Sequence, residues 1–189
     1  MFPPDVSELD VEALSRAKLE HQKQKKKLKK LKKLEDTLWG HVTQYEIIVK
    51  TSNVRGAGTD ANVVITLYGV DADTGEIPLE VNADTGGDKF ERDAQDIFVV
   101  NAMWVGSLQK LRVGHDAKGL GAGWHLERIT VHDCLGRTFY FPCNQWIDVG
   151  YASKKKQIFR ELAPFGEFDT DQVLTAAFHT ENSPQLLQL

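Results

Sequence analysis

The sequence has 189 residues, a mean hydropathy of −0.35 and a formal net charge of −4 at pH 7. This length provides room for one globular domain with a sizeable core plus an extension, and no apolar run approaches the roughly 20 residues that cross a bilayer. Because the chain starts Met-Phe-Pro-Pro-Asp, without the basic and then apolar segments of a signal peptide, we expect a soluble, intracellular, cytoplasmic protein.

The first forty residues predict a long helix. Residues 5–38 contain no Gly or Pro and are dominated by good helix formers, and Ser7 is a candidate N-cap. A narrow apolar stripe recurs at spacings of three, three and four, at Leu28, Leu31, Leu34 and Leu38. The stripe is interrupted earlier in the helix, which argues against a long self-paired coiled coil. A helix this polar lies on a partner or stands in water.

Charge is distributed unevenly along the chain. Residues 16–33 hold ten Lys or Arg and one acid, whereas residues 40–189 hold 13 basic and 20 acidic residues. The densest basic run consists of Lys25, Lys26, Lys27, Lys29, Lys30, Lys32 and Lys33. These lysines predict a surface that binds an acidic partner.

From Tyr45 onward the pattern alternates with a period of two, which is typical of strands. The expected strands cover residues 45–50, 62–68, 97–100, 107–113, 124–132 and 138–141, separated by Gly- and Asp-rich turns. Pro142 is expected to end the last strand, because proline cannot donate to a sheet ladder. The sequence therefore predicts an all-β fold, an antiparallel β-sandwich of about eight strands preceded by the long basic helix.

The segment from Gly119 to Ile147 carries the most specific motifs. The residues Gly123, Trp124, Leu126, Ile129, Phe141, Pro142, Cys143, Trp146 and Ile147 match the pattern Gly-Trp-x-Leu-x-x-Ile to Phe-Pro-Cys-x-x-Trp-Ile. Two further motifs lie upstream, and they occur in the order expected for the same domain: Gly58-Thr59-Asp60 and Phe90-Glu91-Arg92. Residues 44–150 thus closely resemble a PLAT (polycystin, lipoxygenase, alpha-toxin) or LH2 domain, most similar to the repeats of lipoxygenase homology domain-containing proteins.

The resemblance, together with the composition of the flanking segments, predicts three parts of the chain. Residues 1–40 form a basic helical extension, residues 41–151 a PLAT domain, and residues 152–189 a C-terminal extension with a short helix over residues 171–178.

No catalytic constellation stands out, since the six His residues are scattered without the spacing of a zinc site. Lipoxygenases hold their iron in a separate helical domain, for which this chain has no room. We therefore expect no enzymatic activity, and we expect Cys134 and Cys143 to remain reduced thiols.

The resemblance also implies a calcium site. In PLAT domains that bind Ca²⁺, the ligands come from the Gly-Thr-Asp loop, the turn around Phe-Glu-Arg and the loop before Gly-Trp. Carried over by position, the expected ligands are Gly58 and Thr59 through backbone oxygens, with Asp60, Asp88, Glu91 and Asp116 through carboxylates. Ala61 and Lys89 depart from the pattern and reduce the number of ligands. The alternative is that these carboxylates cap backbone amides in turns.

Three functions stay open. The first is a non-catalytic adaptor, in which the sandwich binds a protein partner and the helix docks on an anionic membrane, a tubulin-like acidic surface or, least favoured, nucleic acid. Attachment to a cilium or the cytoskeleton is suggested by analogy alone. The alternative is a calcium-regulated, lipid-binding peripheral membrane module, although its loop tips offer only Val54 and Leu120 to a membrane. The third hypothesis is that the chain is the regulatory subunit of an enzyme.

Overall fold

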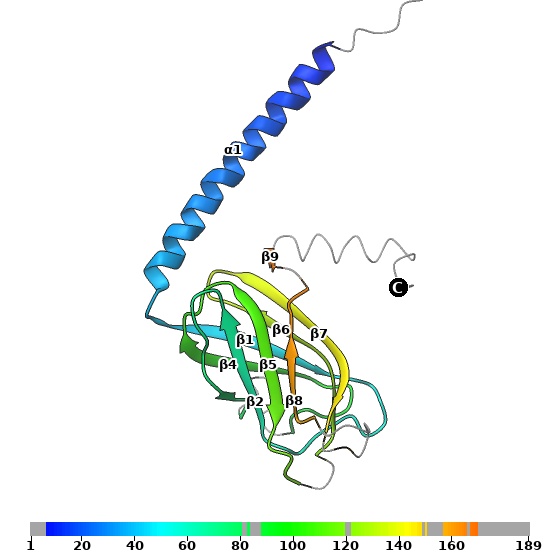
Figure 1. Cartoon of the computed structure of the whole chain (residues 1–189). Coiled ribbons are helices and arrows are strands. Elements are labelled where there is room, and N and C mark those ends of the chain that lie inside the picture. Colours follow the sequence, from blue (N-terminus) through cyan, green and yellow to red (C-terminus); the bar gives the residue numbers. More distant parts are fainter. Residues whose placement is uncertain are drawn as a thin grey trace, which may run out of the picture. The chain divides into compact units, whose positions relative to one another are not determined.

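The computed structural model describes residues 7–80, 83, 88–119, 122–148, 150, 157–165 and 167–169, with backbone only for residues 7–10 and 167–169. The chain divides into two compact units, residues 1–39 and 40–189. The first contains one helix, and the second contains two β-sheets (Figure 1). No helix in the described ranges is long and apolar enough to cross a bilayer.

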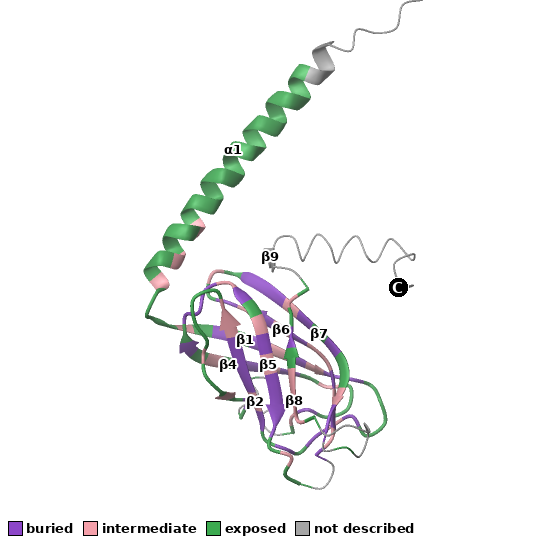
Figure 2. Cartoon of the chain, in the orientation of Figure 1, coloured by how far each residue is buried: buried purple, intermediate pink, exposed green. Residues whose placement is uncertain are grey.

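The helix α1 covers Ser7–Leu38, as predicted, and starts at the candidate N-cap. Its 32 residues correspond to a length of about 48 Å at 1.5 Å per residue. The end is set by Gly40, whose φ of 76° is the left-handed conformation that commonly terminates helices. From residue 11 onward nearly the whole helix surface is exposed (Figure 2), so the helix buries little of its own apolar stripe.

The second unit is an antiparallel β-sandwich, which confirms the predicted fold class. Its five-stranded sheet has the order β4-β1-β6-β7-β9, and its four-stranded sheet the order β3-β2-β5-β8. The strands are β1 Val42–Thr51, β2 Val63–Gly69, β3 Ile77–Pro78, β4 Gln95–Met103, β5 Leu108–His115, β6 Trp124–His132, β7 Arg137–Ile147, β8 Phe159–Leu162 and β9 Glu167–Asp169. The edge strand β8 pairs with β5 and lies beyond residue 151.

The core lies between the sheets, because alternate residues of strands such as β1 and β6 point inward. The predicted core aromatics Trp124, Phe139 and Phe141 are all fully buried. Trp124 satisfies its indole N–H by donating to Thr51 Oγ1 at 3.0 Å. Cys134 is exposed and Cys143 is buried, and both are free thiols.

Pro142 does not end its strand, contrary to the sequence-based expectation. The strand β7 continues through it to Ile147, and Pro142 pairs with Arg128. The register between β6 and β7 shifts between Leu126 and Arg128, next to the partner of Pro142. On the other side of β7, the strand β9 pairs only with residues 137–139, so this pairing ends before Pro142. A proline is tolerated at such a bulge because its missing N–H interrupts no regular ladder. The helix predicted over residues 171–178 lies outside the described residues.

Candidate functional site

The site predicted for calcium is built by three loops at one end of the sandwich: residues 52–62, 88–94 and 116–123. The first two loops pack backbone against backbone. A Cβ on Gly58 would lie 3.1 Å from the Phe90 carbonyl oxygen, and the Thr59 amide donates to that same oxygen at 3.2 Å. Glycine at position 58 therefore lets the second loop approach closely.

Thr59 joins the first loop to the third. Its hydroxyl donates to the Ala122 carbonyl at 3.1 Å and accepts from the Ala61 amide at 3.2 Å. Both groups are buried, so the bonds satisfy polar atoms that water does not reach. The side chain of Thr59 is thus occupied in holding the loops, which leaves its backbone oxygen as the atom predicted to face a cation.

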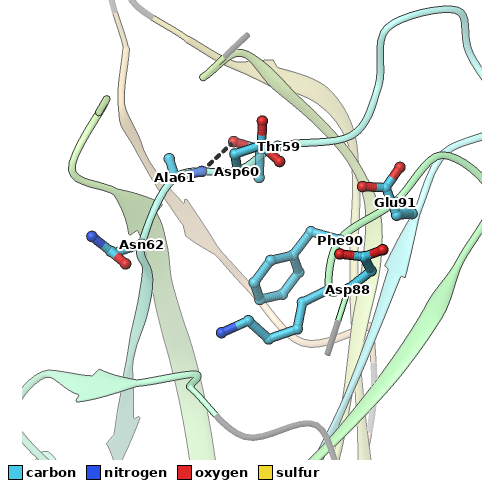
Figure 3. Close-up of a pocket in the computed structure, with 8 residues that line it drawn as sticks. Thr59, Asp60, Ala61, Asn62, Asp88, Phe90 and Glu91 are labelled. Carbon is cyan, nitrogen blue, oxygen red and sulfur yellow. Dashed lines mark hydrogen bonds between the residues drawn. The ribbon is translucent and has the colours of Figure 1, made fainter. Parts of the chain in front are cut away.

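The first two loops enclose a pocket of about 170 Å³ (Figure 3). Its lining consists of Thr59, Asp60, Ala61, Asn62, Asp88, Lys89, Phe90 and Glu91. Three carboxylates therefore share the pocket with one ammonium group. That ammonium, of Lys89, donates to the carbonyl oxygens of Leu79 at 3.3 Å and Glu80 at 2.7 Å. The pocket keeps a net negative lining.

Phe90 anchors the second loop in the core. Its ring is 1% exposed, stacks on Phe98 at 5.5 Å and meets Trp124 edge-on at 5.3 Å. Its backbone has a φ of 60°, which is costly for a bulky residue. The Phe90 amide donates to Asp96 Oδ2 at 2.8 Å, and burial raises the pKa of this aspartate. Core packing thus holds the turn that carries Asp88 and Glu91 in a strained conformation.

Asp116 occupies a different place from the other predicted carboxylates. Its Oδ1 accepts from the amides of Asn62 and Lys118, and its Oδ2 accepts from Asn62 Nδ2 at 2.7 Å. The Asn62 side chain, followed by the Lys118 amide, lowers the pKa of Asp116 to about 2. Figure 3 shows the Asn62 amide pointing away from Asp88 and Glu91. Asp116 therefore caps a turn that ties the end of β5 to the start of β2.

The six predicted ligands are thus only partly brought together. Asp60, Asp88 and Glu91 line one pocket, whereas Asp116 is engaged in its own turn. In the part of the chain that the structure describes, no group of three His, Cys, Asp or Glu side chains is placed to hold a metal ion. The donor chemistry suits Ca²⁺, but the side chains as they lie do not form its coordination shell. The calcium set stays a prediction.

The third loop is closed by a histidine that sequence reasoning assigned no specific role. His115 is fully buried; its Nδ1 accepts from the Ala117 amide at 3.0 Å, so its Nε2–H donates to the Ile147 carbonyl at 2.9 Å. His115 ends β5, directly before a turn in which Ala117 has a φ of 57°. In the sequence, the motif Gly-His-Asp is the only sign of this arrangement. The histidine connects the loop to the end of β7.

The described tips of these three loops offer little apolar surface. Val54 is 42% exposed, and Leu120 lies outside the described residues. Apolar side chains instead lie on the outer side of β1 and β4, in two groups that the polar pair Gln44 and Asn101 separates. These side chains form the sheet patch: Val42, Ile48, Ile97, Val99 and Met103. The sequence contained this signal, since apolar residues occupy both alternating phases of β1 rather than the inward phase alone.

The predicted basic surface lies on α1. All seven lysines from Lys25 to Lys33 are exposed, and Leu28 in their midst is 68% exposed. Arg16 forms an ion pair with Glu12 at 2.9 Å, one turn apart and outside the lysine run. Helix geometry spaces the lysine charges along α1, because lysine favours helix and no Gly or Pro interrupts the run.

Sequence comparison places the sandwich in a known family. The PLAT/LH2 domain model matches residues 45–160. Human lipoxygenase homology domain-containing protein 1 is 42% identical over 106 residues, which is 56% of this chain and 5% of that protein. Human polycystin-1 is 42% identical over 108 residues, which is 56% of this chain and 2% of that protein. The chain thus corresponds to a small part of each relative's length.

Comparison of structures finds the same fold. The crystal structure of coral 8R-lipoxygenase superposes with a TM-score of 0.55 at 22% identity, covering 74% of this chain and 20% of the lipoxygenase. This likeness concerns the fold alone. The matched domain is itself a non-catalytic module, and motifs, sandwich topology and family model agree over the same residues. The chain belongs to the PLAT/LH2 domain family.

Proposed function

We propose that this chain is a non-catalytic adaptor, in which the sandwich binds a protein partner and α1 docks on an acidic surface. The observation that carries the proposal is where the exposed apolar and basic groups lie. The sheet patch exposes Val42 at 65% and Val99 and Met103 at 46% each, whereas the described tips of the three loops around the pocket expose only Val54. A protein surface is the usual partner of an exposed apolar sheet face.

The charge of the two units supports separate partners. Lys25 to Lys33 contains seven lysines and no acid, while residues 40–189 are acidic overall. An acidic surface attracts the helix and repels the sandwich, so electrostatics orients the chain between two partners. We infer a cytoplasmic setting, and by analogy with the relatives a ciliary or cytoskeletal or membrane-attached one.

The helix interaction is tested with the full chain on a poly-glutamate surface. We expect binding that weakens as salt rises from about 50 to about 300 mM, because exposed charges are screened. The variant Lys29→Gln/Lys33→Gln should bind several-fold more weakly, and the matched control Lys18→Gln/Lys23→Gln, outside the densest run, should bind nearly as well as the wild type. Equal losses in both variants would show that the run of lysines is not the binding surface.

The sandwich interaction is tested by affinity capture in detergent, which removes lipid. We expect a stoichiometric protein partner that Val99→Asp releases, because a charge replaces an exposed apolar side chain of the sheet patch. Glu46 faces Val99 across the strand pair, so Glu46→Gln is a control that changes charge beside the patch. A partner retained by Val99→Asp, or retention accounted for by lipid, contradicts the proposed docking face.

A calcium-regulated peripheral membrane module is the second candidate. The observation that favours it is the pocket lined by Asp60, Asp88 and Glu91. Coral 8R-lipoxygenase, which shares this fold, is activated by calcium through a C2-like domain. On this alternative, calcium joins the pocket carboxylates and neutralises the loops before they meet an anionic bilayer.

Vesicle sedimentation separates the two candidates. The membrane candidate predicts that binding to phosphatidylserine vesicles rises with calcium, and that Asp60→Ala abolishes the rise. Asp71→Ala is the control, since Asp71 is also exposed but lies outside the pocket. Vesicle binding that ignores calcium eliminates this candidate and leaves the adaptor.

A further inference from the structure

We propose that α1 is the target helix of a calcium-loaded EF-hand protein, whose acidic groove closes around residues 25–39. The inference deepens the acidic-surface docking of α1 proposed above and rests on it. It names the partner by its chemistry: an apolar groove with acidic rims that encloses a helix on several sides.

The apolar face of the helix has the spacing of groove anchors. At 100° per residue, the leucines at positions 28, 31, 34 and 38 fall within an arc of about 120° and along about 15 Å of the helix axis. Leu28 is 68% exposed and Leu34 is 41% exposed. A helix that enters a hydrophobic groove presents anchors three or four residues apart in this way.

The positions of the lysines favour a groove that encloses the helix over a flat surface. Six of the seven spread over much of the remaining helix circumference, and Lys29 and Lys33 lie on the side opposite the leucines. Lys27 and Glu35 fall within the leucine arc, and with Asp36 the segment 25–39 holds seven lysines and two acids. A flat surface that receives the leucines leaves the ammonium groups of Lys29 and Lys33 on the far side of a helix about 10 Å wide, which exceeds the screening length of about 8 Å at physiological salt. A groove that wraps the helix places acidic groups beside them as well.

Charge and apolar content together select this partner among acidic surfaces. An unstructured acidic tail or a nucleic acid attracts the lysines but leaves Leu28 and Leu34 in water. EF-hand sensors join both properties, because calcium opens a Met-rich groove within an acidic protein. A basic amphipathic helix is typical of their targets.

The test uses the full chain, with calmodulin as the EF-hand probe, in calcium and in EGTA. We expect a one-to-one complex in calcium and at least about 100-fold weaker binding in EGTA, since the groove closes without calcium. Leu31→Gln/Leu34→Gln should weaken the calcium complex at least about tenfold, because each buried leucine contributes apolar transfer energy. Trp39, 58% exposed and directly after the helix, reports binding by its fluorescence.

Thr37→Ala is the matched control, because Thr37 lies away from the leucine stripe and its hydroxyl donates to the Leu34 carbonyl of its own helix. Circular dichroism verifies that each variant keeps its helix. Binding that is equal in calcium and EGTA, or insensitive to the leucine variant, overturns the inference. So does binding to phosphatidylserine vesicles with no binding to calmodulin. Retention on poly-glutamate without a calmodulin complex refutes the EF-hand partner alone, whereas loss of lysine-dependent retention refutes the adaptor proposal.

Discussion

Replacing Phe90 tests how the core holds the acidic turn of the pocket. The Phe90 ring is 1% exposed and packs on Phe98 and Trp124. Truncation to Ala removes both ring contacts and leaves a cavity, so we expect Phe90→Ala to lower the free energy of unfolding by about 4 kcal/mol. A domain of ordinary stability, about 5–15 kcal/mol, still folds after this loss.

The backbone at this position makes a second, sharper expectation. Phe90 has a φ of 60°, and Ala keeps the left-handed cost of about 1 kcal/mol that Gly does not have. We therefore expect Phe90→Gly to be more stable than Phe90→Ala by about 1 kcal/mol. In a regular strand the order is the reverse, with Gly less stable than Ala by about 0.5–1 kcal/mol.

Urea unfolding followed by tryptophan fluorescence measures both differences. The matched control is Phe98, which is buried in the regular strand β4 and stacks on the Phe90 ring. At that position Gly should be the less stable replacement. If Gly is also less stable than Ala at position 90, the left-handed turn carries no strain, and the account of how Asp88 and Glu91 are positioned fails.

Three further predictions concern the rest of the sandwich. A Cβ on Gly114 would overlap the Phe159 ring, so Gly114→Ala should lower the free energy of unfolding in urea by about 1–3 kcal/mol and expose β8 to proteolysis. An unchanged urea midpoint contradicts this expectation. Asp116 has a folded pKa of about 2 against 3.8 unfolded, so its stabilisation is present above pH 3.8 and lost as pH falls toward 2. The thermal midpoints of wild type and Asp116→Asn should therefore converge between about pH 5 and pH 2, and a constant gap refutes the assignment. Burial raises the pKa of both the Cys134 and the Cys143 thiols, but only Cys134 is exposed. Iodoacetamide should therefore modify Cys134 slowly in the native protein and Cys143 only after unfolding, and peptide mass mapping measures both; modification of Cys143 in the native protein contradicts its burial.

Local signals in the sequence were sufficient for the helix and for the core. An unbroken run of helix formers ended by Gly40 specifies α1, because helix formation depends on residues within one turn of each other. The period of two likewise specifies which side of each strand is buried, and the aromatics at Trp124 and Phe139 entered the core as expected. The family motifs connected these strands to a known sandwich.

The strand through Pro142 shows where local reasoning stops. A proline in isolation predicts a strand end, yet the outcome depends on the partner strand, whose bulge beside Arg128 accommodates it. The edge strand β8 is similar, because four residues gain their strand conformation by pairing with β5, which is distant in sequence.

The sequence by itself determined the fold class, the basic helix and the residue types at the three loops. Only the tertiary structure decided what each loop carboxylate does. Asp60, Asp88 and Glu91 share a pocket because Gly58 lets two loops touch, whereas Asp116 turns to the Asn62 amide and is used in a cap. Residue type specifies which atoms can bind a cation, but the direction of a side chain depends on hydrogen-bond partners that come from distant segments of the chain.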